Sequence, residues 1–367
     1  MALGIAADAL SRLAATGWSE PVSGAGVAPA GVQLLFTAQF FANHQLARET
    51  NSKSSSAIHR VLLPLTKRVL EVSRQILYSP TFAERRGSMR IILFMVAVIV
   101  GICSSLAAEP PTPYEVIRFP SGGLTLGGEL FKPKGEGPFP AVLYNHGSAE
   151  GMLSDAASIA MGPLYAAKGW VYFMPYRRGQ GLSAKAGPYI GDQIAAAERS
   201  GGHNDAVKTM IDLLRGDHLS DQLAALAWLK QQKFVQPNRI AVAGQSFGGI
   251  ETILGAASYP FCAAVDASGG AMSWKEEPAL QEVMKENARS SKSPTFFFQA
   301  ENDYTLEPSQ VLYKEMLASG KTAEIKIYPP YGKTNFDGHS FTWLGSSIWF
   351  NDVFGFIQKN CAATASK

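Results

Sequence analysis

Ser246 lies between two glycines in the segment 244–248, GQSFG, directly after an apolar run that ends at Gly244. When Gly-x-Ser-x-Gly joins a strand to a helix, it forces a sharp turn that pushes the serine hydroxyl out of the sheet. Glycine gives room where a side chain would collide with the tight backbone, and the helix N-terminus favours developing negative charge. The pattern predicts Ser246 as a nucleophile for attack on an acyl group. The alternative is a glycine-rich loop with an incidental serine.

A serine hydroxyl needs a base, and His339 in the segment 335–341, NFDGHSF, is the expected one. In the chain order serine, acid, histidine, the base comes last, in a loop beyond the final strand. His203 and His218 belong to a polar insertion ahead of the serine. We expect both of these histidines to lie at the surface.

The acid that orients the imidazole is expected to be Asp303, which closes the apolar run 295–303. Asp266, at the end of the preceding apolar run, is the second choice. Asp337 lies only two residues from His339, and this short spacing makes a productive side-chain geometry awkward. Asp303 is therefore the predicted third member of a catalytic group with Ser246 and His339.

Acyl transfer also needs two preorganised N–H donors for the oxyanion. One is predicted to be the backbone N–H of Phe247, the residue after the serine. The other is predicted to be that of Ser148, in the loop NHGSAEG that follows an earlier apolar run. His146 in this loop is expected to have a structural role, bonding across the loop.

Two further residues are candidates for binding substrate, each with an ordinary alternative. Trp274, in the long insertion 271–291, would line an acyl or alcohol pocket or would pack a surface helix. Arg177 follows a strand end together with Arg178. Arg177 would bind a substrate carboxylate or, in the favoured interpretation, hold the loop through an ion pair. The insertion 183–216 is predicted to form helices over the site.

The elements that must position these residues alternate between strand and helix from residue 114 onward. Their central strands are almost wholly apolar, which is typical of a parallel sheet covered by helices on both faces. We therefore predict an α/β fold, a doubly wound, mostly parallel sheet flanked by helices, with working groups at the carboxyl ends of strands. The predicted strands are 114–119, 124–133, 139–147, 170–176, 239–244, 262–268, 295–303 and 323–330, with clear helices at 219–232 and 346–360.

These motifs together resemble the α/β-hydrolase superfamily, and more narrowly its dienelactone hydrolase and prolyl-oligopeptidase-like branch. The residues that carry the resemblance are NHGSAEG, YRRGQGLS, GQSFGG, END and GHSF, in the family's order, within about residues 112–360. The resemblance implies a serine hydrolase that acts on carboxylic esters through a Ser-His-Asp triad. The dienelactone enzymes are similar but use cysteine, so Ser246 favours a general esterase or a peptidase. Peptidases of the prolyl-oligopeptidase type carry a β-rich propeller, and no such region precedes residue 112, which weakens the peptidase alternative.

Residues 89–108, MRIILFMVAVIVGICSSLAA, have the three-part form of a signal peptide, with an apolar core that is short for a membrane span. The alternative is a membrane anchor formed by residues 91–108. Residues 1–88 are expected to be a poorly ordered extension, or a spurious stretch ahead of a true start at Met89. The catalytic domain would then be 109–367, exported to the periplasm or secreted.

Export would permit a disulfide between Cys262 and Cys361, although a buried free thiol at Cys262 is an equally ordinary interpretation. Neither His/Cys spacing suited to zinc nor a phosphate-binding loop is present in the sequence, so no cofactor and no metal are expected.

The formal net charge is +3, and the basic excess belongs to residues 1–88, with 9 Lys and Arg against 5 Asp and Glu. Nothing in residues 109–367 indicates a nucleic-acid surface, so the expected partner is a small-molecule ester or a short peptide. Membrane contact is expected only through residues 89–108 if they stay uncleaved. A non-catalytic binding protein that kept the fold is the competing class.

Overall fold

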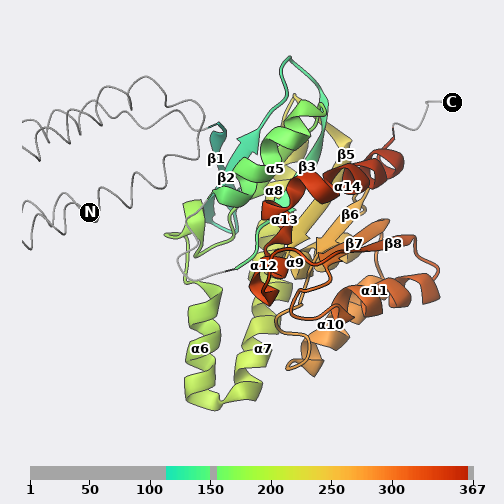
Figure 1. Ribbon diagram of the computed structural model, residues 1–367. Helices are drawn as coiled ribbons and strands as arrows, with labels where there is room; N and C mark the ends of the chain where they lie inside the picture. The colour runs from blue at the N-terminus through green and yellow to red at the C-terminus, as the bar shows by residue number, and fades with distance from the viewer. Residues whose placement is uncertain (1–112, 149–154, 363–367) are drawn as a thin grey trace, which may run out of the picture. The chain divides into compact units, whose positions relative to one another are not determined.

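An eight-stranded sheet forms the centre of the computed structural model, which describes residues 113–148 and 155–362 (Figure 1). The predictions for residues 1–88 and 89–108 lie outside these ranges. The strand order is β1-β2-β4-β3-β5-β6-β7-β8. The strands are β1 Glu115–Ser121, β2 Leu124–Phe131, β3 Phe139–Asn145, β4 Val171–Pro175, β5 Val235–Gln245, β6 Ala264–Ala267, β7 Thr295–Ala300 and β8 Ala323–Tyr328.

The sheet is mostly parallel, as predicted. β2 pairs antiparallel with β1 and with β4, while every neighbouring pair from β4 to β8 is parallel. Every residue of β4, β6 and β7 is buried, because helices cover both faces of these strands. The edge strand β8 instead alternates between half-buried and exposed residues along most of its length.

Alternating side chains of each strand supply the cores on the two faces of the sheet. In β3, Val142 and Tyr144 belong to one apolar cluster, whereas Ala141 and Leu143 belong to another. In Figure 1, α5, α13 and α14 lie in front of the sheet. The helices are α5 Ala156–Ala167, α6 Ile190–Gly201, α7 His203–Leu213, α8 Leu219–Gln231, α9 Phe247–Ser258, α10 Pro278–Arg289, α11 Glu307–Ala318, α12 Asn335–His339, α13 Phe341–Leu344 and α14 Ser346–Asn360, with a 3₁₀ turn η2 at Gly181–Ser183.

The insertion before α8 is helical, and α6 and α7 run side by side as a hairpin that extends from the sheet (Figure 1). α7 continues into α8 through a π-helical turn, η3 Leu214–His218. This turn corrects one prediction: His203 is exposed, but His218 is fully buried. The π-turn continues the helix without a break and packs against α9, which places the His218 ring inside rather than at the surface. Burial lowers the pKa of His218 to about 3, so the ring is neutral at ordinary pH.

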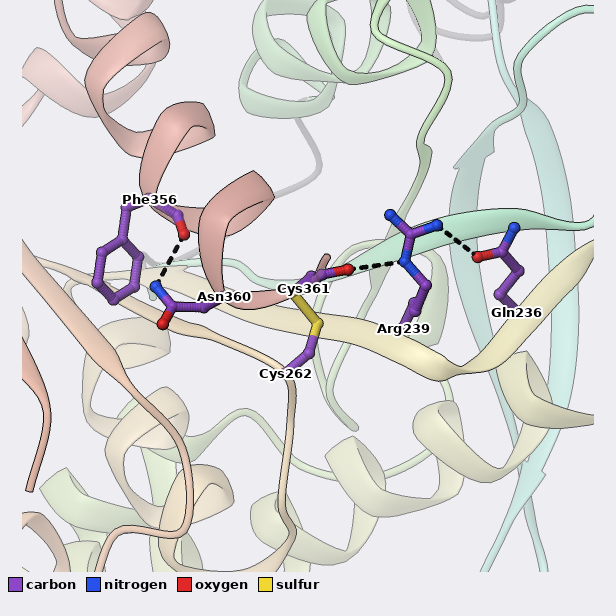
Figure 2. The surroundings of a disulfide bond; sticks show 6 residues. All are labelled: Gln236, Arg239, Cys262, Phe356, Asn360 and Cys361. Atoms are coloured by element: carbon purple, nitrogen blue, oxygen red, sulfur yellow. Dashed lines mark hydrogen bonds between the residues drawn. A yellow bond between two sulfur atoms is a disulfide. The ribbon is translucent and has the colours of Figure 1, made fainter. Parts of the chain in front are cut away.

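A disulfide joins Cys262 to Cys361, which decides between the two interpretations left open by the sequence (Figure 2). It ties the residue after α14 to the segment that enters β6, across a sequence separation of 99 residues. Arg239 adds to the same junction, because its Nε donates to the Cys361 carbonyl at 2.7 Å. In the chain-entropy treatment, closing a loop of about 100 residues stabilises the folded state by about 5 kcal/mol.

Candidate active site

Ser246 occupies the turn between β5 and α9, with φ of 58° and ψ of −121°. Positive φ is rare for a residue with a side chain and costs about 1–3 kcal/mol, so the surroundings must impose it. The two flanking glycines explain how. A Cβ on Gly244 would lie 2.1 Å from the Gly248 carbonyl oxygen, and one on Gly248 would lie 1.9 Å from that of Asn145. Only glycine permits this close approach of the turn to itself and to the end of β3.

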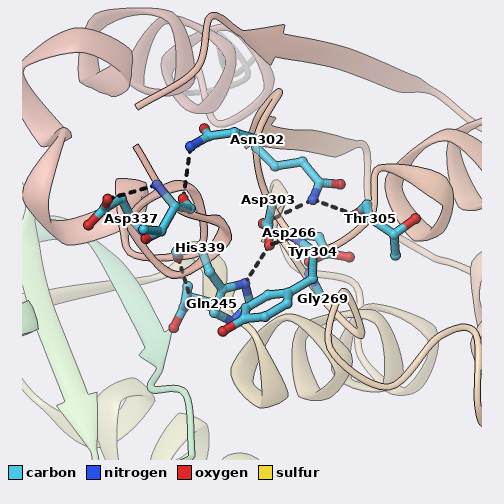
Figure 3. Close-up of polar contacts among 11 residues, drawn as sticks. Gln245, Asp266, Gly269, Asn302, Asp303, Tyr304, Thr305, Asp337 and His339 are labelled. Carbon is cyan, nitrogen blue, oxygen red and sulfur yellow. Dashed lines mark hydrogen bonds and ion pairs between the residues drawn. The ribbon is translucent and has the colours of Figure 1, made fainter. Parts of the chain in front are cut away.

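Asp303 and His339 meet at the carboxyl end of the sheet (Figure 3). Oδ1 of Asp303 lies 2.8 Å from Nδ1 of His339 and also accepts the backbone N–H of Tyr304 at 2.7 Å. Oδ2 accepts an N–H of Gln299 at 3.1 Å. The carboxylate therefore has donors on both oxygens, and it fixes the proton of His339 on Nδ1. The opposite atom, Nε2, is buried and has no hydrogen-bond partner among the described residues, which leaves it able to accept a proton.

The loop that carries His339 is tied both to the serine turn and to the loop of Asp303. Gln245, the residue before Ser246, donates its side-chain N–H to the His339 carbonyl at 3.1 Å. Asn302, the residue before Asp303, donates to the carbonyls of Tyr331 and Thr334 at 2.9 Å each. These contacts hold the two loops together. Sequence reasoning passed over Gln245 and Asn302, although both are amides directly beside a predicted catalytic residue.

The other two candidate acids have different roles. Asp266 is fully buried, its Oδ1 accepts the Gly269 N–H at 2.8 Å, and burial raises its pKa to about 7. Asp337 caps the short helix α12 by accepting backbone N–H groups of Lys333 and Thr334, and these bonds lower its pKa. Neither carboxylate hydrogen-bonds to His339 in the described part of the chain.

The loop after β3 lies against the serine turn. A Cβ on Gly147 would lie 2.7 Å from the Gln245 side-chain oxygen and 3.5 Å from Cβ of Ser246. Ser148 follows directly, so its backbone belongs to this contact. Phe247 opens α9, where the first N–H groups have no partner within the helix. The structure thus brings the loop of Ser148 and the helix start at Phe247 to the same place as Ser246.

His146 bonds within this loop, in the structural role expected for it. Its Nε2 accepts the backbone N–H of Arg177 at 3.2 Å, so its Nδ1 carries the proton and donates to the Gly147 carbonyl at 2.6 Å. The ring is 2% exposed, and burial holds its pKa well below the ordinary value. A neutral His146 thereby keeps one fixed tautomer.

Arg177 holds the same loop, but through carbonyls rather than through the ion pair expected for it. Its side chain is 5% exposed and donates to backbone and side-chain oxygens of the loop. The ion pairs belong to its neighbour Arg178, whose guanidinium lies 2.7 Å from Asp221 and 2.7 Å from Asp217. A buried Arg177 whose Nη1 and Nη2 both donate to this loop has the surroundings of a structural residue rather than of a substrate anchor.

Trp274 is a core residue in this structure. It is 2% exposed and belongs to an apolar cluster with Leu280 and Met284 of α10. A surface hollow of about 500 Å³ is lined by residues of α7 and the start of α10, including the exposed His203 and the half-buried Glu277, which lie 3.6 Å apart. The lining contains neither Trp274 nor any member of the Ser246, Asp303 and His339 group.

Within residues 113–148 and 155–362, no group of three or more His, Cys, Asp and Glu residues is placed to hold a metal ion. None of the helices described there combines the length and the apolar character needed to cross a membrane.

A sheet in this strand order, with a strained serine after β5, a carboxylate after β7 and a histidine after β8, defines an α/β-hydrolase. The chain belongs to the dienelactone hydrolase family, whose model matches residues 126–355. Both findings confirm the fold and the resemblance seen in the sequence.

The chain is also similar to a curated protein and to solved structures. The chain is 24% identical over 221 residues to protein usf of Aquifex pyrophilus, covering 58% of this chain and 83% of that protein. It is similar to the acylaminoacyl peptidase of Pyrococcus horikoshii, with a TM-score of 0.50 and 19% identity, over 72% of this chain and 45% of that one. It is also similar to a Pyrococcus furiosus esterase, with a TM-score of 0.48 and 16% identity, over 67% of this chain and 90% of that one. The matched part thus spans less than half of the peptidase.

Proposed function

We propose that this chain is an exported serine hydrolase that cleaves carboxylic esters through an acyl-enzyme on Ser246. The observation that supports this best is the contact between Asp303 and His339, which leaves Nε2 of His339 buried and without a partner among the described residues. This histidine is tied through Gln245 to the turn that carries the strained Ser246. A base, its orienting acid and a serine hydroxyl on a sharp turn are the parts that nucleophilic acyl transfer requires.

In the first half of the proposed reaction, the Ser246 oxygen attacks the ester carbonyl carbon while its proton moves to Nε2 of His339. The carbonyl π electrons move to oxygen, and the N–H groups of Phe247 and Ser148 stabilise the resulting oxyanion. When the carbonyl re-forms, the bond to the alkoxide breaks and His339 returns its proton to that leaving group. The products of this half are an alcohol and an acyl-Ser246 ester.

In the second half, water repeats the same steps. His339 takes a proton from water as the oxygen attacks the acyl carbon, and the same donors stabilise the second oxyanion. Collapse breaks the bond to Ser246, and His339 gives the proton back to the serine oxygen. Asp303 stays ionised throughout and stabilises the imidazolium that forms twice in each cycle.

The test uses a short p-nitrophenyl ester with the variants Ser246→Ala and Ser268→Ala. Ser268 is a matched control, because it is also a serine with φ of 58° and follows the end of β6, the strand beside β5. We expect Ser246→Ala to lose nearly all turnover and Ser268→Ala to keep it, with both proteins folded. Retained turnover in the first variant would overturn the proposal. A fluorophosphonate probe that fails to label Ser246 would instead favour a non-catalytic binding protein.

A peptidase is the competing activity for the same residues. The similar acylaminoacyl peptidase is more than twice as long as the part that this chain matches. We therefore propose the ester as the substrate class. A kcat/KM for aminoacyl-naphthylamides above that for p-nitrophenyl esters would favour the peptidase.

Export is supported by the disulfide between Cys262 and Cys361, because such bonds persist in oxidising compartments. The signal-like segment 89–108 is consistent with this. Mass spectrometry of the protein isolated from its native host should give a mature N-terminus close to residue 109. An intact segment 91–108 in the mature protein would indicate a membrane anchor instead.

A further inference from the structure

Two neighbouring peptide units of the loop after β3 are held by one buried guanidinium. Nη1 of Arg177 donates to the His146 carbonyl at 2.6 Å, and Nη2 donates to the Gly147 carbonyl at 3.0 Å. The Gly147 carbonyl also accepts the Nδ1 proton of His146 at 2.6 Å. The two terminal nitrogens of the guanidinium therefore donate to two consecutive carbonyls, a geometry that the single ammonium of lysine cannot reproduce.

The direction of these carbonyls fixes the direction of the next N–H groups. A peptide bond is planar, and in its trans form the C=O and N–H point to opposite sides. The cis bond found among the described residues is Gly137–Pro138, so the units of this loop are trans. With the Gly147 carbonyl directed at Arg177, the N–H of Ser148 must point away from it. Gly147 itself lies against Ser246, which makes the serine turn the neighbouring surface of this loop.

We infer that Arg177 is a positioning residue that presets the Ser148 N–H as an oxyanion donor. This inference rests on the proposed function, and it deepens that function by naming what orients the donor. Arg177 acts through the backbone and does not touch the reacting atoms. We call the contact of Arg177 with the His146 and Gly147 carbonyls the clamp. Gln180 supports it, since its side-chain oxygen accepts from Nη2 of Arg177 at 3.2 Å.

A loop without this clamp would have to order its donor during the reaction. An oxyanion donor is effective because it is already oriented when charge develops, and losing one donor costs about 10²–10³-fold in kcat. The hydrogen bond from the Ser148 N–H contributes little to the binding of the neutral ester in the ground state. Loss of Arg177 should therefore lower kcat and leave KM nearly unchanged.

The test compares Arg177→Lys with Arg178→Lys, the same chemical change at adjacent positions. Turnover of a p-nitrophenyl ester is expressed per active site, counted by fluorophosphonate titration, so that a loss of folded protein does not imitate the effect. We expect a fall in kcat of about 10-fold or more for Arg177→Lys with KM within about threefold, and nearly unchanged values for Arg178→Lys. The affinity for a trifluoromethyl ketone, whose serine adduct carries an oxyanion, should fall in parallel with kcat/KM.

A second pair keeps the inference testable if the Arg177 variant does not fold. Ser148→Pro removes the backbone N–H, whereas Ser148→Ala keeps it and removes only the hydroxyl that contacts Arg177 and Gln180. We expect kcat of the proline variant to be about 10²-fold lower than kcat of the alanine variant.

Unchanged kcat and ketone affinity per active site in Arg177→Lys would overturn the inference, as would equal activity of the two Ser148 variants. Ester cleavage through an acyl-enzyme on Ser246 would still stand in both cases, because it is judged by Ser246→Ala. A wild-type protein without ester turnover would overturn both.

Discussion

Nδ1 of His339 lies 2.8 Å from Oδ1 of Asp303, although the two residues are 36 positions apart in the chain. Asp303 follows β7, and His339 is the last residue of α12, beyond β8. The contact therefore depends on the parallel pairing of β7 with β8. Both side chains are nearly inaccessible, at 7% exposure for His339 and 0% for Asp303. In such surroundings, the orientation of the imidazole is set by the protein and not by solvent.

The first prediction concerns this contact. Asp303→Asn should lower kcat by about 10³–10⁴-fold, because an amide favours the wrong tautomer of His339 and does not stabilise its cation. Turnover of a p-nitrophenyl ester across a range of pH measures the effect. Asp266→Asn is the matched control and should keep activity within a few-fold, since Asp266 bonds to Gly269 instead. Equal losses in the two variants would argue against Asp303 as the acid.

The second prediction concerns the glycines of the serine turn. Gly248→Ala should destabilise the protein strongly, because its Cβ would lie 1.9 Å from the backbone oxygen of Asn145, which cannot move aside. Gly355→Ala, in the middle of α14, meets no heavy atom within 4 Å and should raise the unfolding free energy by about 0.5–1 kcal/mol. Urea unfolding followed by circular dichroism compares the two. A Gly248→Ala protein as stable as the wild type would show that the turn is not this tight.

The third prediction concerns Glu251, which is buried within α9 and whose carboxylate oxygens have no hydrogen-bond partner among the described residues. Burial raises the pKa of Glu251 from 4.5 to about 8 in the folded state. The folded protein therefore binds more protons than the unfolded chain between these values. The stability that Glu251 contributes is complete below pH 4.5 and is lost as the pH rises through 8, at about 1 kcal/mol per pH unit.

Glu251→Gln should therefore lose less unfolding free energy than the wild type between pH 6.5 and 8.5. The window avoids His218, whose lowered pKa affects stability only below pH 6.5 and in the opposite direction. The stability that Asp266 contributes also falls with rising pH. This fall is equal in both proteins, so it does not change the difference between their unfolding free energies. Glu282→Gln, at an exposed carboxylate, is the control and should follow the wild-type curve. Parallel curves for Glu251→Gln and the wild type would contradict the prediction.

The fourth prediction concerns the disulfide. Replacing both Cys262 and Cys361 by serine should lower the unfolding free energy by about 2–5 kcal/mol, because the unfolded chain regains the freedom of a long loop. Guanidinium unfolding with and without a reducing agent checks this result. The reducing agent should destabilise the wild type and leave the double variant unchanged. A wild type that is indifferent to reduction would show that the two thiols are not bonded.

The order and approximate position of the strands can be predicted from the sequence, because buried parallel strands are continuous apolar runs. The boundary of β7 was less clear: the predicted strand reached Asp303, but pairing stops at Ala300 and a turn carries the acid. His218 was misjudged because a polar insertion can continue as a helix and turn one polar ring inward. Cys262 and Cys361 are 99 residues apart, and only the folded packing of α14 beside β6 brings them together.

The assignment of Arg177 and Arg178 shows a further limit. Adjacent arginines are equivalent in composition, yet beyond the end of β4 at Pro175 one of them, Arg177, contacts the loop after β3 and the other, Arg178, contacts Asp221. The sequence predicted a loop-holding role for this pair without indicating which residue contacts carbonyls and which contacts carboxylates. That division depends on the path of the chain after β4 and on the neighbours that the loop after β3 and α8 bring to it, which no local pattern contains.

The disulfide closes residues 262–361 into a covalent ring that contains Asp303 and His339 but not Ser246. A protease cut anywhere inside this ring leaves both fragments joined to one another. The exposed loops around the acid and the base can therefore be nicked without release of either residue, whereas a cut between Ser246 and Cys262 separates the nucleophile from both. Resistance to degradation is thus unevenly distributed, because the ring protects the covalent link between the acid and the base but not the link from either of them to the nucleophile.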